Sequence, residues 1–130
     1  MPQLVSIVGS GQTTHASKRL DVNIPELVHE AVSRAFENTG LSPKDIDAYV
    51  IGNMEFFEGI NLSDLWASEG SGSFLKPSIK IATGGTTGTS LAACGYHHCA
   101  SGMFETVMVI GWEKQSESDT TGGIITVFDP

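Results

Sequence analysis

Blocks of apolar and polar residues alternate along the chain and predict strands and helices in turn. Short runs of aliphatic and β-branched residues predict buried strands at residues 4–8, 48–51, 78–82 and 106–110. Between these runs, apolar residues recur at helical spacing, which predicts helices that alternate with the strands. Lys80 lies between two isoleucines, so one face of its strand is expected to be open or paired with another group.

Capping residues and turns mark the ends of several predicted elements. Asn23 and Glu26 have the spacing of a capping box at a helix start, and Gly40 is placed to end that helix. Residues 68–73 are rich in serine and glycine and are interpreted as a flexible link after a short second helix. The stretch 122–128 is interpreted as either a strand or a docked loop.

The order of these elements predicts the fold class. Strands that alternate with helices favour an α/β fold, with a mixed or parallel sheet and helices on its faces. A chain of 130 residues is long enough to bury one core, so we expect a single domain over residues 1–130.

Charge and cysteine content narrow the function classes. With 7 basic and 15 acidic residues, the net charge of -8 argues against nucleic acid or an anionic membrane as the main partner. No apolar run approaches the roughly 18 residues that span a bilayer, and the N-terminus lacks a signal-peptide pattern. Cys94 and Cys99 fall on different faces of one predicted helix, so we expect no disulfide and a cytoplasmic location.

A glycine-rich turn follows the third predicted strand. Gly84, Gly85 and Gly88 allow backbone N–H groups to approach a ligand, and the N-terminus of the next helix favours an anion. The turn is either an active-site turn or one that only allows close packing of helix and strand. A nucleotide- or phosphate-binding α/β module would use the same turn from Gly84 to Gly88, although the turn lacks a P-loop lysine and residues 9–11 form only part of a dinucleotide fingerprint.

Motifs around this turn resemble those of the thiolase superfamily, in the branch of archaeal thiolases and the thiolase-like part of sterol carrier proteins. In that family a strand leads into a Cys-Ala-Ser-Gly turn, followed later by a glycine, an apolar strand and Gly-x-Glu-Lys. Here the Thr-Gly pair at 87–88 matches Ser-Gly, and Gly102, a strand and the Gly-Trp-Glu-Lys run at 111–114 follow in register. This register places Gly85 at the position of the nucleophilic cysteine.

The resemblance implies a function as well as a fold. Residues 1–130 would be the N-terminal domain of a thiolase-like protein, with its C-terminal half absent and with acyl-CoA as substrate rather than any cofactor. Gly85 cannot act as a nucleophile, so no catalytic residue is assigned. The residues implied to bind the thioester are Gly84, Gly85, Thr86, Thr87 and Gly88.

The resemblance also implies partners. The parent protein would be an acyl-CoA retro-aldolase that works with a separate OB-fold subunit, or a non-catalytic subunit of a thiolase complex. The strand between Ser78 and Ala82 would pair with its counterpart in a homodimer, because an open strand edge favours pairing.

Other reactive residues are given structural interpretations. The run Cys99-Ala-Ser-Gly102 spells the thiolase nucleophile motif, but it ends a helix just before the last strand, so we expect a small buried cysteine. Cys94 and His98 are spaced to share a helix face, but two ligands do not make a metal site, and no metal is predicted. The charged residues expected to be solvated or to end strands are Glu55, Glu58, Glu113 and Lys114.

Overall fold

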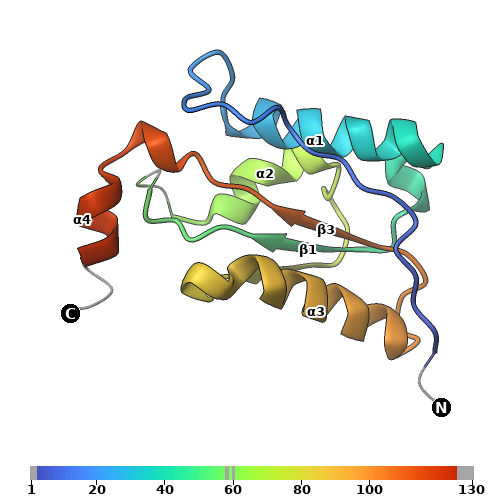
Figure 1. Cartoon of the computed structure of the whole chain (residues 1–130). Helices are drawn as coiled ribbons and strands as arrows, with labels where there is room; N and C mark the ends of the chain where they lie inside the picture. The colour runs from blue at the N-terminus through green and yellow to red at the C-terminus, as the bar shows by residue number, and fades with distance from the viewer. Residues whose placement is uncertain (1–2, 58, 60, 126–130) are drawn as a thin grey trace.

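A three-stranded parallel sheet organises the molecule in the computed structural model, which describes residues 3–57, 59 and 61–125. Its strands lie in the order β2-β1-β3 (Figure 1), and their bounds are Ala48–Gly52 for β1, Ser78–Ile81 for β2 and Val107–Gly111 for β3. Val50 of β1 lies opposite Ile79 of β2 on one side and Val109 of β3 on the other. The predicted α/β fold class is therefore confirmed.

Four α-helices and three 3-10 turns connect the strands within the described residues. The helices are α1 Ile24–Thr39, α2 Ser63–Ser71, α3 Thr87–Ala100 and α4 Thr120–Ile125, and the 3-10 turns are η1 Pro43–Asp45, η2 Gly84–Thr86 and η3 Gln115–Glu117. The predicted capping box is confirmed, because Asn23 accepts from the Glu26 N–H at 2.9 Å and Glu26 accepts from the Asn23 N–H at 2.8 Å. Gly40 ends α1 with a left-handed φ of 71°.

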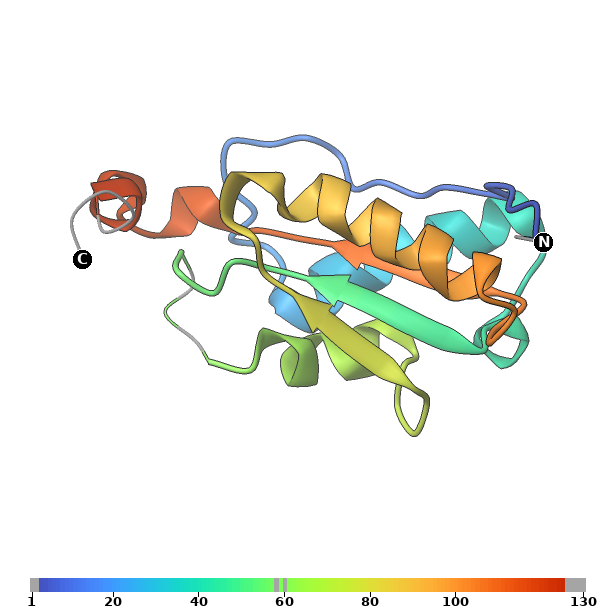
Figure 2. The same ribbon diagram turned by 90° about the horizontal axis from the view of Figure 1, so that it is seen from below.

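The helices cover the two faces of the sheet, as Figures 1 and 2 show. On one face, α1 and α2 pack over β1, where Tyr49 and Ile51 join Val28 and Val32 in the core. On the other face, α3 packs so closely that a Cβ on Gly52 would lie 2.5 Å from the Leu91 side chain. Because β1 is enclosed by helices and by both neighbouring strands, all five of its residues are buried.

The prediction of a strand at residues 4–8 is wrong. The segment forms no strand (Figure 1), and Ile7 is 93% exposed while Val8 is 68% exposed. Its continuation lies against α1, because a Cβ on Gly11 would be only 2.1 Å from the Ala31 carbonyl oxygen. A strand needs a neighbour that satisfies its N–H and C=O groups, and no described strand is paired with these residues.

Two other expectations are corrected. Residues 68–73 are not a flexible link, because Ser68 to Ser71 complete α2, and the buried Ser71 and Ser73 hydroxyls are hydrogen-bonded at 2.9 Å. Residues 122–125 belong to α4 rather than to a strand or loop, while 126–128 lie outside the described residues. Within the described part of the chain, no helix has both the length and the apolar character that a membrane span requires.

Candidate functional site

The carboxyl ends of all three strands meet at one edge of the sheet, because the strands are parallel. This is the edge at which open α/β sheets bind ligands. The segments that leave it are the run from Asn53 after β1, the turn Gly84–Thr86 after β2 and the run from Trp112 after β3. The glycine-rich turn predicted from the sequence therefore lies at the expected edge.

Threonine hydroxyls hold the glycine-rich turn in shape. Thr83 N–H donates to Thr87 Oγ1 at 3.0 Å, and Thr87 Oγ1 donates to the Gly84 carbonyl at 2.8 Å. Thr86 Oγ1 donates to the Thr83 carbonyl at 2.8 Å. The two hydroxyls of Thr86 and Thr87 are thus engaged with the backbone of the turn.

The glycines of this turn face open space. A Cβ added to Gly84, Gly85 or Gly88 would meet no heavy atom within 4 Å. Only Gly84 has a left-handed backbone, with φ at 61°. Close packing therefore does not require glycine at 85 or 88, which distinguishes the turn from Gly52, where the same Cβ would strike Leu91.

Asn53 joins the ends of β1 and β3. It is 1% exposed, and its Nδ2 donates to the Trp112 carbonyl at 2.9 Å while its Oδ1 accepts from the Glu55 N–H at 2.6 Å. Glu113 adds a second link, because its Oε1 accepts from the Met54 N–H at 2.6 Å. The sequence reasoning missed Asn53, although a polar residue directly after a fully apolar strand was a signal for it.

Lys114 and Glu55 are less exposed than the sequence suggested. The Lys114 side chain is 8% exposed, and its Nζ donates to the Val22 carbonyl at 2.6 Å and pairs with Glu117 at 2.8 Å. Glu55 pairs with Lys80 and accepts from the Ser63 N–H at 3.0 Å. The Lys80 contact and the Ser63 hydrogen bond lower the pKa of Glu55. Glu58 lies outside the described residues.

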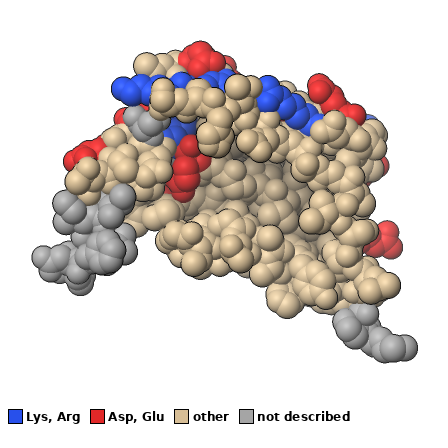
Figure 3. Space-filling model, in the orientation of Figure 1, with Lys and Arg blue, Asp and Glu red and all other residues tan. Residues whose placement is uncertain are grey.

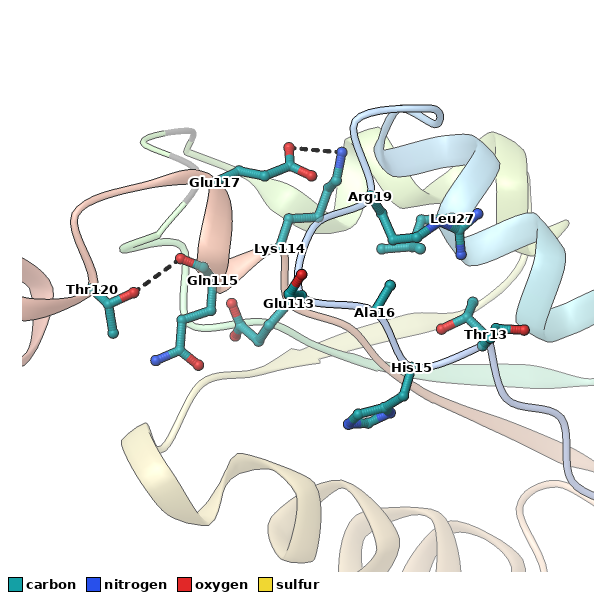
Figure 4. Close-up of a pocket in the computed structure, with 12 residues that line it drawn as sticks. Thr13, His15, Ala16, Arg19, Leu27, Glu113, Lys114, Gln115, Glu117 and Thr120 are labelled. Atoms are coloured by element: carbon teal, nitrogen blue, oxygen red, sulfur yellow. Dashed lines mark hydrogen bonds and ion pairs between the residues drawn. The ribbon is translucent and has the colours of Figure 1, made fainter.

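A cavity of about 430 Å³ opens beside the end of β3 (Figure 4). Residues 13–17 and the run Glu113 to Gln115 line it from two sides. Arg19 also lines it, but its guanidinium is bound by Asp21 at 2.9 Å and Glu30 at 2.8 Å. These two carboxylates raise the pKa of Arg19 and compensate its charge. The cavity is therefore polar, with no excess of positive charge from Arg19.

The cysteines do not form a site with the glycine-rich turn. Both are free thiols and both are half-buried, so the expectation of a buried Cys99 is wrong. Cys99 lies near the C-terminus of α3, roughly 20 Å from the turn at the helix N-terminus, since a helix rises about 1.5 Å per residue. His98 Nδ1 lies 2.9 Å from the Cys94 carbonyl and 3.5 Å from its Sγ. Within the described residues no group of three or more metal-ligating side chains comes together.

Sequence comparison gives two longer relatives. The chain is 30% identical over 129 residues to an acetyl-CoA acetyltransferase of Methanothermobacter thermautotrophicus, which covers 96% of this chain and 33% of that protein. It is also 30% identical over 128 residues to an acetyl-CoA acetyltransferase of Methanocaldococcus jannaschii, which covers 96% of this chain and 32% of that protein. The chain is distantly similar to archaeal enzymes of the thiolase superfamily. No protein-family model matches it.

The thiolase-like chain spans about a third of the length of these curated relatives. The similarity supports the resemblance that the motifs around Gly85 suggested. The geometry adds that the turn from Gly84 to Gly88 is open and lies at the ligand-binding edge of the sheet.

Proposed function

We propose that this chain is the N-terminal part of a thiolase-like protein that binds an acyl-CoA thioester on the turn from Gly84 to Gly88. The observation that carries the proposal is the open space at Gly85, at the carboxyl edge of a parallel sheet and before the N-terminus of α3. Backbone N–H groups at such a position can stabilise the thioester oxygen, and the helix N-terminus favours the negative charge that it acquires.

The same turn argues against a covalent acyl-enzyme. Gly85 has no side chain to accept the acyl group. The neighbouring Thr86 and Thr87 hydroxyls donate to the carbonyls of Thr83 and Gly84. These backbone oxygens hold the hydroxyl protons, so neither hydroxyl is arranged as a nucleophile. We therefore propose a parent protein that holds a thioester without forming an acyl-enzyme. Two roles require no acyl-enzyme: retro-aldol cleavage of an acyl-CoA, and a non-catalytic role in a thiolase complex.

A homodimer through β2 is the second part of the proposal. Within the described residues, β2 pairs with β1 alone, which leaves its other edge open. Large exposed apolar side chains lie on β2, on the turn before it and on α2, namely Ile79, Phe74, Leu75, Leu65 and Trp66. Exposed apolar patches of this kind mark interaction sites. The OB-fold partner of the parent stays a prediction from the resemblance alone.

Ligand titration with a charge variant tests the thioester site. We expect the chain to bind acetyl-CoA, and Gly85→Asp to weaken that binding at least about tenfold, because the new carboxylate repels the thioester oxygen at a helix N-terminus. Ala93→Asp is the matched control, since it adds the same charge at an exposed position on the same helix. Binding is measured by calorimetry, with folding checked by circular dichroism.

Parallel titrations separate the proposal from its alternative. Binding of ATP or NAD that Gly85→Asp weakens, without acetyl-CoA binding, would favour a nucleotide- or phosphate-binding module instead. Acetyl-CoA binding that responds equally to Gly85→Asp and Ala93→Asp would place the thioester elsewhere. Either result rejects the proposed site.

A further inference from the structure

The run that follows β3 lies against the start of α3. A Cβ on Gly95 would lie 2.4 Å from Val109 Cγ2, and a Cβ on Gly111 would lie 3.1 Å from Leu91 Cδ1. The helix therefore runs antiparallel to the strand and reaches the end of β3 at Leu91. Gly88 lies a further rise of about 4.5 Å along the helix axis. In Figure 2 the start of α3 and the run after β3 overlap, and Figure 1 places them in adjacent layers.

Glu113 in this run faces the start of α3. Trp112 continues the ladder between β1 and β3, because its N–H donates to the Gly52 carbonyl at 3.2 Å. Side chains alternate between the two faces of an extended run, so Glu113 points to the same face as Gly111, which is the face that α3 covers. The Met54 N–H donates to Glu113 Oε1 at 2.6 Å and fixes the carboxylate in this position.

The cavity of about 430 Å³ joins this carboxylate to the exposed His15. In Figure 4 the side chains of His15, Glu113 and Gln115 extend toward the layer of α3, whereas Lys114 extends toward the layer of α1. The same layer of α3 begins with the turn from Gly84 to Gly88, whose glycines face open space. The polar wall of the cavity is therefore turned toward the proposed thioester site.

The charges around the cavity limit the groups that it can bind. Arg19 and Lys114 line it, and each is already paired with a carboxylate. Figure 3 shows the hollow between the layers of α1 and α3, which is lined mostly by uncharged residues and has acidic side chains at one end. An anionic group would meet the carboxylate of Glu113 without a compensating cation from this lining. A hydroxyl group can instead donate to Glu113 and make a second hydrogen bond with His15.

We propose that Glu113 and His15 select the acyl group of the bound thioester, and that the acyl group they select is short, uncharged and hydroxylated. This inference rests on the proposed thioester site and names the substrate class that the site takes. A hydrogen bond from a hydroxyl to a carboxylate is about twice as strong as one between neutral groups. An acyl chain without the hydroxyl would cover the carboxylate of Glu113 and leave it without that partner, which is unfavourable.

Calorimetric titration with acetyl-CoA, butyryl-CoA, 3-hydroxybutyryl-CoA and malonyl-CoA tests the selection. Butyryl-CoA and 3-hydroxybutyryl-CoA differ by a single hydroxyl, and we expect the hydroxylated thioester to bind at least about tenfold more tightly. Malonyl-CoA should bind at least about tenfold more weakly than acetyl-CoA, because its carboxylate is brought close to Glu113. The ratio of two affinities measured on one protein is the readout, so a general loss of folding does not imitate the result.

Substitutions of the two selecting residues should remove the preference. His15→Ala and Glu113→Gln should each reduce the preference for 3-hydroxybutyryl-CoA over butyryl-CoA to less than about threefold. Glu113→Gln keeps an oxygen that can accept from the Met54 N–H, and it should also improve the binding of malonyl-CoA. His97→Ala and Glu37→Gln are the matched controls, since they change exposed residues of the same types outside the lining of the cavity. Both controls should keep the native ratios.

Three results would overturn the selection and leave the thioester site in place, provided that acetyl-CoA binding still responds to Gly85→Asp. The first is equal affinity of the native chain for butyryl-CoA and 3-hydroxybutyryl-CoA. The second is a native ratio in His15→Ala and Glu113→Gln, which would place the hydroxyl elsewhere. The third is binding of malonyl-CoA as tight as that of acetyl-CoA. If none of the thioesters binds, the thioester site and the selection are rejected together.

Discussion

Two apolar runs of similar character have opposite fates in this protein. Residues 4–8 and β1 are both short and rich in β-branched and aliphatic residues; Gly9 follows the first run and Gly52 ends β1. β1 lies between two strands and two helix layers, and Val50 is 0% exposed. Ile7 in the other run is 93% exposed. The difference teaches that neighbours on both sides, rather than composition, decide whether a run becomes a strand.

Introducing an aspartate into each of the two runs should give the largest difference in the free energy of unfolding. Val50→Asp buries a carboxylate between two strands, which we expect to cost roughly 3–5 kcal/mol and to unfold a domain of ordinary stability. Ile7→Asp should change the free energy of unfolding by less than about 0.5 kcal/mol, because its side chain is already in water. Urea denaturation measures both, and equal effects would mean that residues 4–8 are buried in solution.

Glycine substitutions on α3 sharpen the contrast between packed and open surfaces. A Cβ at Gly95 would lie 2.4 Å from Val109 Cγ2, so Gly95→Ala should destabilise the domain by about 1–3 kcal/mol. Gly88 lies on the same helix with no heavy atom within 4 Å of an added Cβ. Gly88→Ala should therefore stabilise the domain by about 0.5–1 kcal/mol. Thermal denaturation of the two variants should shift in opposite directions.

Acid should loosen the segment that follows β1 before it loosens the strand. The folded-state pKa of Glu55 is lowered below its ordinary 4.5 by Lys80 and by the Ser63 N–H. Its stabilising contribution is therefore complete above pH 4.5 and is lost as the pH falls through the lower folded-state pKa.

Hydrogen exchange at Ser63 measures this loosening. The protection of the Ser63 amide, which is its exchange rate relative to the intrinsic rate at the same pH, should fall as the pH drops below 4.5 in the native chain, and it should already be low at neutral pH in Glu55→Ala. An Asp64→Asn variant is the control, because Asp64 makes neither contact and should keep the acid response. Acid-independent exchange at Ser63 in the native chain would show that Glu55 does not hold this segment.

The smallest effect should come from the hydrogen bond that holds the N-terminal segment. Asn38→Ala removes the donor to the Ser10 carbonyl at an exposed site. The free energy of unfolding should change by less than about 0.5 kcal/mol, whereas proteolysis within residues 4–12 should become faster. Unchanged proteolysis would mean that the hydrogen bond from Arg34 to the Gln12 carbonyl and the close contact of Gly11 with α1 are enough to hold the segment.

Much of the fold could be predicted because local signals agreed with the tertiary structure. The capping box of Asn23 and Glu26 and the left-handed Gly40 define α1 through contacts within a few residues. The strands at 48–51, 78–82 and 106–110 were found from apolar runs, and parallel pairing of the outer two with β1 then completed the sheet. The serine-rich run 68–73 was misread, because the hydrogen bonds that bury Ser71 and Ser73 form only after α2 has packed.

The candidate site was predictable in its position but not in its surroundings. A glycine-rich turn after a predicted strand was enough to place Gly84 to Gly88 at the carboxyl edge. The link from Asn53 to the Trp112 carbonyl joins residues that are 59 positions apart, and no local pattern encodes such a pair. Lys114 was expected to be a solvated charge. Its side chain is instead nearly buried, because its Nζ donates to the Val22 carbonyl, a partner that no local pattern reveals.

The sequence by itself determined the order of the elements from α1 to β3, the ends of α1 and the absence of a nucleophilic side chain at Gly85, since each depends on the residues present and their near neighbours. Only the tertiary structure decided that Gly85 faces open space while Gly52 meets Leu91, although both are glycines at the carboxyl edge. It also decided that β1 is buried while residues 4–8 are exposed. A strand is completed by hydrogen bonds to distant segments, and that condition cannot be read from a run of five residues.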